Sequence, residues 1–229
     1  ALVYNFYKST KMATQNKLWA GMAKETAHQI GTPLTSLVGW VEILKSENVD
    51  ESTTNEIEKD IERLQTITDR FSKIGSEPKL ENKDIIEETQ KSYDYLQSRF
   101  SKQIEFTFTG PEAPVIVLFN PTLHSWTIEN LVKNAIDAMK GRGKLALEVL
   151  HEGGFVRINI SDTGSGIPKN QFKSVFEPGF TTKKRGWGLG LSLTKRIVEE
   201  YHKGTIKVLH SEIGKGTTMQ VSFKVTELI

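Results

Sequence analysis

Cysteine is absent from this chain of 229 residues, which excludes disulfide bonds and thiolate metal sites. An excess of either charge is also lacking, because 30 basic and 28 acidic residues leave a formal net charge of only +2. This balance gives no electrostatic reason to expect a nucleic-acid partner. No apolar run reaches the ~20 residues that a membrane-spanning helix requires. With 37% hydrophobic residues, the composition is typical of a globular protein with one or two domains.

A short apolar and aromatic segment, residues 1–7, opens the chain and is followed by Lys8 and Lys11. Basic residues commonly flank the cytoplasmic end of a membrane helix. The segment is therefore either the cytoplasmic stub of a membrane anchor that precedes Ala1 or the frayed end of a helix. The first alternative predicts a cytoplasmic domain of a membrane-anchored protein.

Two long helices are predicted in the first third of the chain. Apolar residues recur in steps of three or four, or multiples of these, from Leu18 to Leu44 and again from Ile57 to Ile74. Polar residues 48–52 separate the helices, and Gly75 with Pro78 ends the second one. A single helical hairpin cannot cover its own apolar stripe. We therefore expect residues 1–76 to form a helical hairpin that dimerises into a four-helix bundle.

Residues 77–229 show a mixture of helical and strand patterns that predicts an α+β fold, with a mixed sheet under helices. Helices are predicted over residues 84–100, 121–139 and 191–201. Strands are predicted over residues 103–109, 115–119, 145–150, 155–161, 205–209 and 217–225. Gly153 and Gly154 have the composition of a hairpin turn. Residues 164–190 are rich in glycine and lysine and are predicted to form a long loop.

His28 and Pro33 stand close together inside the first predicted helix. Proline cannot donate a hydrogen bond to the carbonyl of Gln29, so the helix should bend within one turn of His28. A kink beside a titratable nucleophile suggests chemistry at this histidine. The other four histidines have no comparable neighbours and are expected to be structural or exposed.

Three further motifs have the chemistry of a nucleotide site. Asn130 and Asn134 share one helix face, and amide oxygens suit Mg²⁺. Asp162 ends a predicted strand before Gly164 and Gly166, where a flat ring can approach the backbone. A third group of glycines precedes a helix whose N-terminus can receive phosphate, namely Gly186, Gly188 and Gly190.

In this order, the motifs resemble the H, N and glycine-rich boxes of the sensor histidine kinases of two-component systems, over residues 8–227. The resemblance implies that ATP phosphorylates His28 and that the phosphoryl group passes to an aspartate on a response-regulator receiver domain. It also implies that Asn134 ligates Mg²⁺, that Asn130 supports the phosphates and that Asp162 accepts the adenine amine. The other residues expected at the ATP site are Lys133, Gly164, Gly166, Phe180, Thr182, Lys183, Gly186, Gly188, Leu189, Gly190 and Thr217.

Two positions bear on whether the chain is a kinase. Related ATPases that hydrolyse ATP carry a glutamate four residues before the metal-binding asparagine, whereas this chain has Asn130, which cannot act as a base. Most related kinases carry Glu or Asp after the histidine, but here Gln29 can only accept a hydrogen bond and cannot remove a proton. Gln29 therefore leaves open a nucleotide-binding pseudokinase, or dimeric scaffold, as the alternative function. A chaperone-like hydrolase is disfavoured by Asn130 and by the hairpin.

Thr32 lies one turn from His28 on the same helix face. In related bifunctional kinases a residue at this position orients the water that dephosphorylates the regulator. Thr32 is therefore a candidate phosphatase residue, or a threonine that bonds back to a helix carbonyl.

Overall fold

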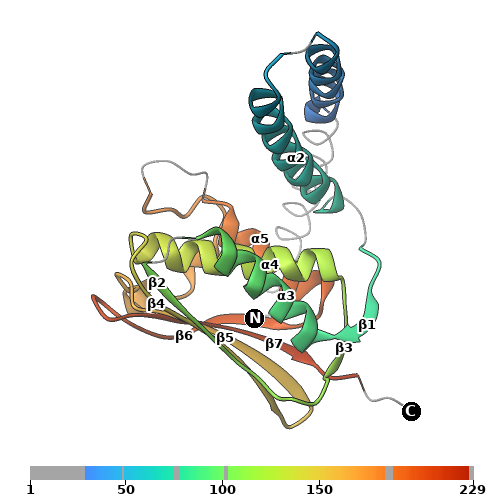
Figure 1. Cartoon of the computed structure of the whole chain (residues 1–229). Helices are drawn as coiled ribbons and strands as arrows, with labels where there is room; N and C mark the ends of the chain where they lie inside the picture. The colour runs from blue at the N-terminus through green and yellow to red at the C-terminus, as the bar shows by residue number, and fades with distance from the viewer. Residues whose placement is uncertain (1–28, 48, 75–77, 101–102, 184–187, 227–229) are drawn as a thin grey trace, which may run out of the picture. The chain divides into compact units, whose positions relative to one another are not determined.

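The computed structural model describes residues 29–47, 49–74, 78–100, 103–183 and 188–226 (Figure 1). Contacts divide the chain into two compact units, Ala1–Pro78 and Lys79–Ile229, which are described separately below. The predicted phosphoacceptor, His28, lies outside the described residues, as does Gly186.

The first unit contains two helices, one described over residues 29–46 and the other, α2, spanning Glu51–Ile74. Asp50 caps α2, because its Oδ2 accepts the amide N–H of Thr53 at 3.0 Å. The helices pack through three buried side chains, Leu34, Val41 and Ile61. The predicted helical hairpin is therefore present. Residues 29–46 remain helical through Pro33, and the bend predicted beside His28 involves residues outside the described ranges.

Much of the hairpin's apolar surface is uncovered within this unit. Trp40 is 61% exposed, and other large apolar side chains are exposed as well, namely Ile30, Leu37, Val38, Ile43 and Leu64. A groove on the hairpin is lined by Gly31, Leu34, Thr35, Val38, Gln65 and Thr68. This surface has the character expected of a helix pair that packs against a second pair. Among the described residues, no helix is both long and apolar enough to span a membrane.

A five-stranded mixed sheet forms the floor of the second unit. Its strand order is β2-β4-β5-β7-β6, with β2 parallel to β4 and every other neighbouring pair antiparallel. The strands span Ile104–Thr109 (β2), Gly143–Glu152 (β4), Phe155–Asp162 (β5), Thr205–Glu212 (β6) and Gly216–Lys224 (β7). Gly153 and Gly154 join β4 to β5 with φ angles of 59° and 76°, which is the predicted two-residue hairpin turn.

Three helices cover one face of this sheet: α3 (Ile85–Arg99), α4 (Pro121–Ala138) and α5 (Gly190–Arg196) (Figure 1). A π-helical turn, η3 (Ile197–Tyr201), continues α5, and two 3₁₀ turns, η1 (Lys169–Gln171) and η2 (Ser174–Phe176), interrupt the predicted long loop. One apolar core joins the sheet and helices and includes Ile128, Leu145, Ile158 and Phe223. The predicted α+β fold, with a mixed sheet under helices, is confirmed.

One strand was not predicted. Residues Glu81–Asp84 form β1, which pairs antiparallel with β3 (Ile116–Phe119), whereas the sequence analysis assigned no strand here and predicted a helix from residue 84. Asp84 is instead the N-cap of α3, since its Oδ1 accepts the amide N–H of Ile86 at 3.1 Å. The strand has four residues, all polar, and therefore shows no apolar alternation.

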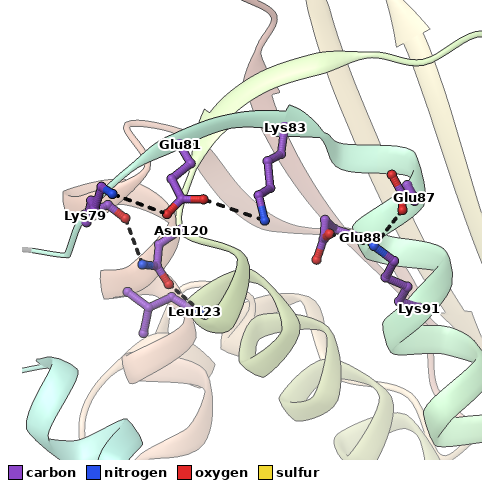
Figure 2. Close-up of polar contacts among 8 residues, drawn as sticks. All are labelled: Lys79, Glu81, Lys83, Glu87, Glu88, Lys91, Asn120 and Leu123. Carbon is purple, nitrogen blue, oxygen red and sulfur yellow. Dashed lines mark hydrogen bonds and ion pairs between the residues drawn. The ribbon is translucent and has the colours of Figure 1, made fainter.

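Asn120 fixes the start of this strand to the start of α4 (Figure 2). Its side-chain amide donates to the carbonyl oxygen of Lys79 at 2.8 Å, while its Oδ1 accepts the N–H of Leu123 at 3.0 Å. The backbone N–H of Asn120 also donates to Nε2 of the buried His202 at 3.1 Å. The chain segment that leads into this unit is thus attached to the helix that carries Asn130 and Asn134.

Candidate nucleotide site

The C-terminal half of α4, from Glu129 onward, carries five polar residues. Asn130, Asn134 and Asp137 follow one another at spacings of four and three residues, which places them on one helix face. Glu129 lies on a neighbouring face and forms an ion pair with Lys133, whose Nζ is 2.6 Å from Oε1 of Glu129. Glu129 therefore holds a lysine that the sequence assigned to the ATP site.

Lys183 contacts this face from the loop between β5 and α5. Its Nζ lies 3.1 Å from Oδ1 of Asn134 and 2.6 Å from Oδ2 of Asp137. The predicted magnesium-binding atom, Oδ1 of Asn134, thus already faces a cationic group. Asp137 was missed by the sequence analysis, although its spacing from Asn134 places it on the same face.

Asp162 ends β5 with its side chain half-buried. Its Oδ1 accepts the amide N–H of Gly164 at 2.7 Å. Burial raises the pKa of Asp162 above its ordinary value, and hydrogen bonds from the backbone of Gly164 and Thr217 lower it only in part. Each carboxylate oxygen has two lone pairs, so Asp162 can accept a further hydrogen bond from a ligand.

Gly164 is required by its contact with α4. A Cβ atom at this position would lie 2.7 Å from the carbonyl carbon of Ala138, which is too close for a side chain. The next amide, of Ser165, donates to the carbonyl oxygen of Ala138 at 3.1 Å. This turn therefore brings the end of β5 against the helix that carries the two asparagines.

Thr217 lies directly beside Asp162, because these two residues are paired in the ladder between β5 and β7. Its hydroxyl is buried and lies 2.9 Å from Oγ of Ser211, which in turn accepts the amide N–H of Ile167 at 2.7 Å. The close approach of Gly166 to the Glu212 carbonyl brings the same two segments together. Asp162, Gly164, Gly166 and Thr217 thus form one side of the site.

The glycine-rich segment leads into α5. Gly188 accepts a backbone hydrogen bond from Gly179 at 3.1 Å, and Leu189 is the N-cap residue of α5. Gly190 is the first residue of the helix, and space is open where its Cβ would lie. Phe180 packs against the apolar core, while Thr182 is exposed. Thr194, in the interior of α5, contacts Asn130. Thr194 was also missed by the sequence analysis.

The remaining predicted residues belong to the first unit. Gln29 and Thr32 are exposed residues at the start of the described part of the first helix. His28, together with Gly186, lies outside the described residues. The other four histidines divide evenly, since His124 and His202 are buried and His151 and His210 are exposed.

One kind of ligand suits these features: an adenine nucleotide with a bound cation. The features are two asparagines on one helix, an aspartate hydrogen-bonded to a glycine turn, and a glycine-rich segment at the start of a helix. The family described as histidine kinase-, DNA gyrase B- and HSP90-like ATPase matches residues 123–227. The second unit is therefore an ATPase-type nucleotide-binding domain of this class.

The first unit narrows the family. The His Kinase A phospho-acceptor domain matches residues 19–77, a range that includes His28. Sporulation kinase E of Bacillus subtilis is 30% identical over 232 residues, which cover 96% of this chain and 30% of that protein. The chain belongs to the sensor histidine kinases of two-component systems. It spans about a third to a half of the length of the curated relatives it matches.

Two solved structures share the fold. A full-length ShkA in complex with AMPPNP has a TM-score of 0.71, with 20% identity over 91% of this chain and 46% of that chain. The histidine kinase ThkA in complex with the response regulator TrrA has a TM-score of 0.62, with 24% identity over 99% of this chain and 67% of that chain.

Proposed function

We propose that this chain is the kinase core of a dimeric sensor. ATP binds the second unit, its γ-phosphoryl group is transferred to His28, and an aspartate of a response-regulator receiver domain then receives it. The observation that carries this proposal is the combination of a phosphoacceptor domain covering His28 with a nucleotide domain that has Asn130 where hydrolases have a base. The domain boundary is placed between residues 76 and 77.

At the nucleotide site, Asp162 accepts the exocyclic amine of adenine through its remaining oxygen. Asn134 would supply an oxygen ligand to Mg²⁺, and this assignment is supported by its Oδ1, which faces the cationic ammonium group of Lys183. The charge on the phosphates would be neutralised in part by Mg²⁺ held at this position. Lys183, which contacts the face that carries Asn134, and Lys133, which pairs with Glu129 on the neighbouring face, are assigned to the triphosphate. The other glycine-box residues assigned above form the surrounding loop.

The transfer step needs only positioning and charge neutralisation from the protein. A nitrogen of the neutral His28 imidazole attacks the γ-phosphorus, an N–P bond forms, and the bond to the β,γ-bridging oxygen breaks as ADP leaves. The proton on the other ring nitrogen is then lost to solvent, because the neighbouring Gln29 amide cannot take it. Thr32 is assigned to a separate phosphatase reaction, in which it orients the water that hydrolyses the phosphoaspartate of the regulator and releases inorganic phosphate.

The exposed apolar face of the hairpin supports a homodimer formed through a four-helix bundle. ThkA in its complex with TrrA supports a response regulator as the second partner. Attachment to a membrane through a segment before Ala1, and hence a cytoplasmic location for this core, stays a prediction.

A second function is favoured by one residue. Gln29 in place of an acidic side chain is compatible with a pseudokinase that uses nucleotide only as a conformational ligand. Three alternatives, namely the kinase, an ATP hydrolase and the pseudokinase, are distinguished by incubating the chain with γ-labelled ATP and Mg²⁺. Wild type is compared with His28→Gln and with His151→Gln, a control at an exposed histidine.

Label that is acid-labile, lost in His28→Gln and kept in His151→Gln is the result expected for the kinase. Free labelled phosphate without labelled protein would instead identify a hydrolase. Nucleotide binding with neither product would identify the pseudokinase.

A further inference from the structure

Thr194 is a fully buried threonine in α5, with 0% of its surface exposed. Its hydroxyl donates to the carbonyl oxygen of Gly190, one turn earlier, at 2.9 Å. Across the interface with α4, the same hydroxyl oxygen lies 3.4 Å from Nδ2 of Asn130. Thr194 therefore stands between the glycine-rich helix start and the first asparagine of the nucleotide site.

The chemistry of these groups fixes the orientation of the Asn130 amide. A carbonyl oxygen can only accept a hydrogen bond, so the single hydroxyl proton of Thr194 is directed to Gly190. The hydroxyl then has only lone pairs to offer to Asn130, and the atom that faces it must be the NH₂ group. Because Thr194 is buried, its hydroxyl is shielded from bulk water.

We propose that Thr194 is a positioning residue that sets the polarity of Asn130. With Nδ2 held at Thr194, the atom that Asn130 offers to a ligand is Oδ1. An oxygen here, one turn from Oδ1 of Asn134, favours a cation and its coordinated waters and disfavours direct contact with phosphate oxygens. This assignment rests on the proposed nucleotide function and changes the role of Asn130 from phosphate contact to support of the metal.

Without the hydroxyl, the amide of Asn130 can turn over at little cost. Its NH₂ group would then point toward the cation, where a donor is unfavourable, and the metal would bind less tightly. Outer-shell hydrogen-bond partners of metal sites commonly change metal affinity by about 10- to 100-fold when they are removed. Binding of ATP without metal does not depend on this orientation and should stay the same.

The test compares Thr194→Val, which keeps the shape and removes the hydroxyl, with Thr194→Ser, which keeps the hydroxyl. Thr127→Val is the matched control, because Thr127 is also fully buried and bonds back to a helix carbonyl, that of Leu123 at 3.0 Å. Calorimetric titration with ATP is performed on the full chain, both in EDTA and over a range of Mg²⁺ concentrations.

Thr194→Val should require about tenfold more Mg²⁺ for half-maximal enhancement of ATP binding, with its affinity for metal-free ATP unchanged. Thr194→Ser and Thr127→Val should match wild type within about twofold. An unchanged Mg²⁺ requirement in Thr194→Val, or an equal loss in Thr194→Ser or with metal-free ATP, would overturn the inference alone. A wild-type chain that binds no ATP would overturn the proposed function as well.

Discussion

Among single residues, Asp162 is the one whose surroundings most narrowly define what it can bind. One of its oxygens accepts the Gly164 amide at 2.7 Å, and the turn that holds this amide is packed against α4. The carboxylate therefore cannot rotate freely to offer either oxygen. In the proposed complex, its second oxygen must accept the amine that distinguishes adenine from guanine.

Replacing Asp162 with asparagine should weaken ATP binding at least tenfold. The new side chain must use its only oxygen to accept the Gly164 amide, which turns its NH₂ group toward the adenine amine, donor against donor. The measurement is the ATP dissociation constant by calorimetry for Asp162→Asn and for Asp94→Asn, an exposed carboxylate on α3 that serves as the control. Equal affinity in Asp162→Asn and wild type would remove Asp162 from the adenine site.

Among the elements, the pair β5 and β7 is held together where Asp162 meets the start of β7. Gly216 has a φ angle of 121°, and a Cβ there would lie 1.9 Å from the carbonyl oxygen of Asp162. Gly214, in the turn just before, also has a positive φ of 78°, but its Cβ would meet no atom within 4 Å. Both glycines thus have positive φ angles, which are unfavourable for residues with a side chain. They differ because only a side chain at Gly216 would collide with Asp162.

We expect Gly214→Ala to lower the free energy of unfolding by about 1 kcal/mol, the cost of backbone strain alone. Gly216→Ala should cost at least ~3 kcal/mol, because the strands must also separate at Asp162. Urea unfolding of both variants gives the comparison. Similar losses in the two variants would show that the contact with Asp162 is easily relieved.

Sequence patterns were sufficient for elements that carry their own local signal. The Gly153-Gly154 turn, the end of α2 at Ile74 and the start of α4 at Pro121 were all predicted from residues within a few positions. The strand β1 was not, because its polar residues gain strand structure only by pairing with β3.

The same distinction applies to the site. Asn130, Asn134 and Asp162 stand in recognisable motifs, and the structure places them on α4 and at the end of β5. Asp137 shares a helix face with Asn134 by its spacing alone, but its contact with Lys183, like the contact of Thr194 with Asn130, appears only in the folded structure. No pattern within one segment reports a contact between residues 64 positions apart.

For the molecule as a whole, two buried histidines connect the helices to the sheet. The rings of His124 and His202 both pack edge-on against Phe119 and also contact Phe223. Each ring has one engaged nitrogen, since Nε2 of His124 lies 2.8 Å from the Thr89 hydroxyl and Nε2 of His202 accepts the Asn120 amide. Burial lowers the pKa of His124 to about 3 and that of His202 to about 4.

This pair should make the chain less stable in acid. Both histidines are neutral in the folded protein near pH 5, whereas in the unfolded chain they take up protons below about pH 6.5. Because the unfolded state binds more protons, its free energy falls relative to the folded state as the pH drops. The free energy of unfolding should decrease by up to about 1.4 kcal/mol per pH unit for each histidine between pH 6 and pH 5.

Urea unfolding at several pH values measures this slope. His202→Gln should reduce it by about half, and His151→Gln, at an exposed position, should leave it as in wild type. A free energy of unfolding that does not change between pH 7 and pH 5 would contradict the expected protonation of these histidines.

The short strand β3 receives both ends of the second unit. It pairs with β1 on one side, its Val117 bridges to Val225, and the carbonyl oxygen of Ile116 accepts the amide N–H of Thr226 at 2.9 Å. The chain therefore comes into this domain and goes out of it at neighbouring points. Because both ends lie close together, this domain can be exchanged onto another helical hairpin, or fused to a further protein at its C-terminus, at a single site on its surface.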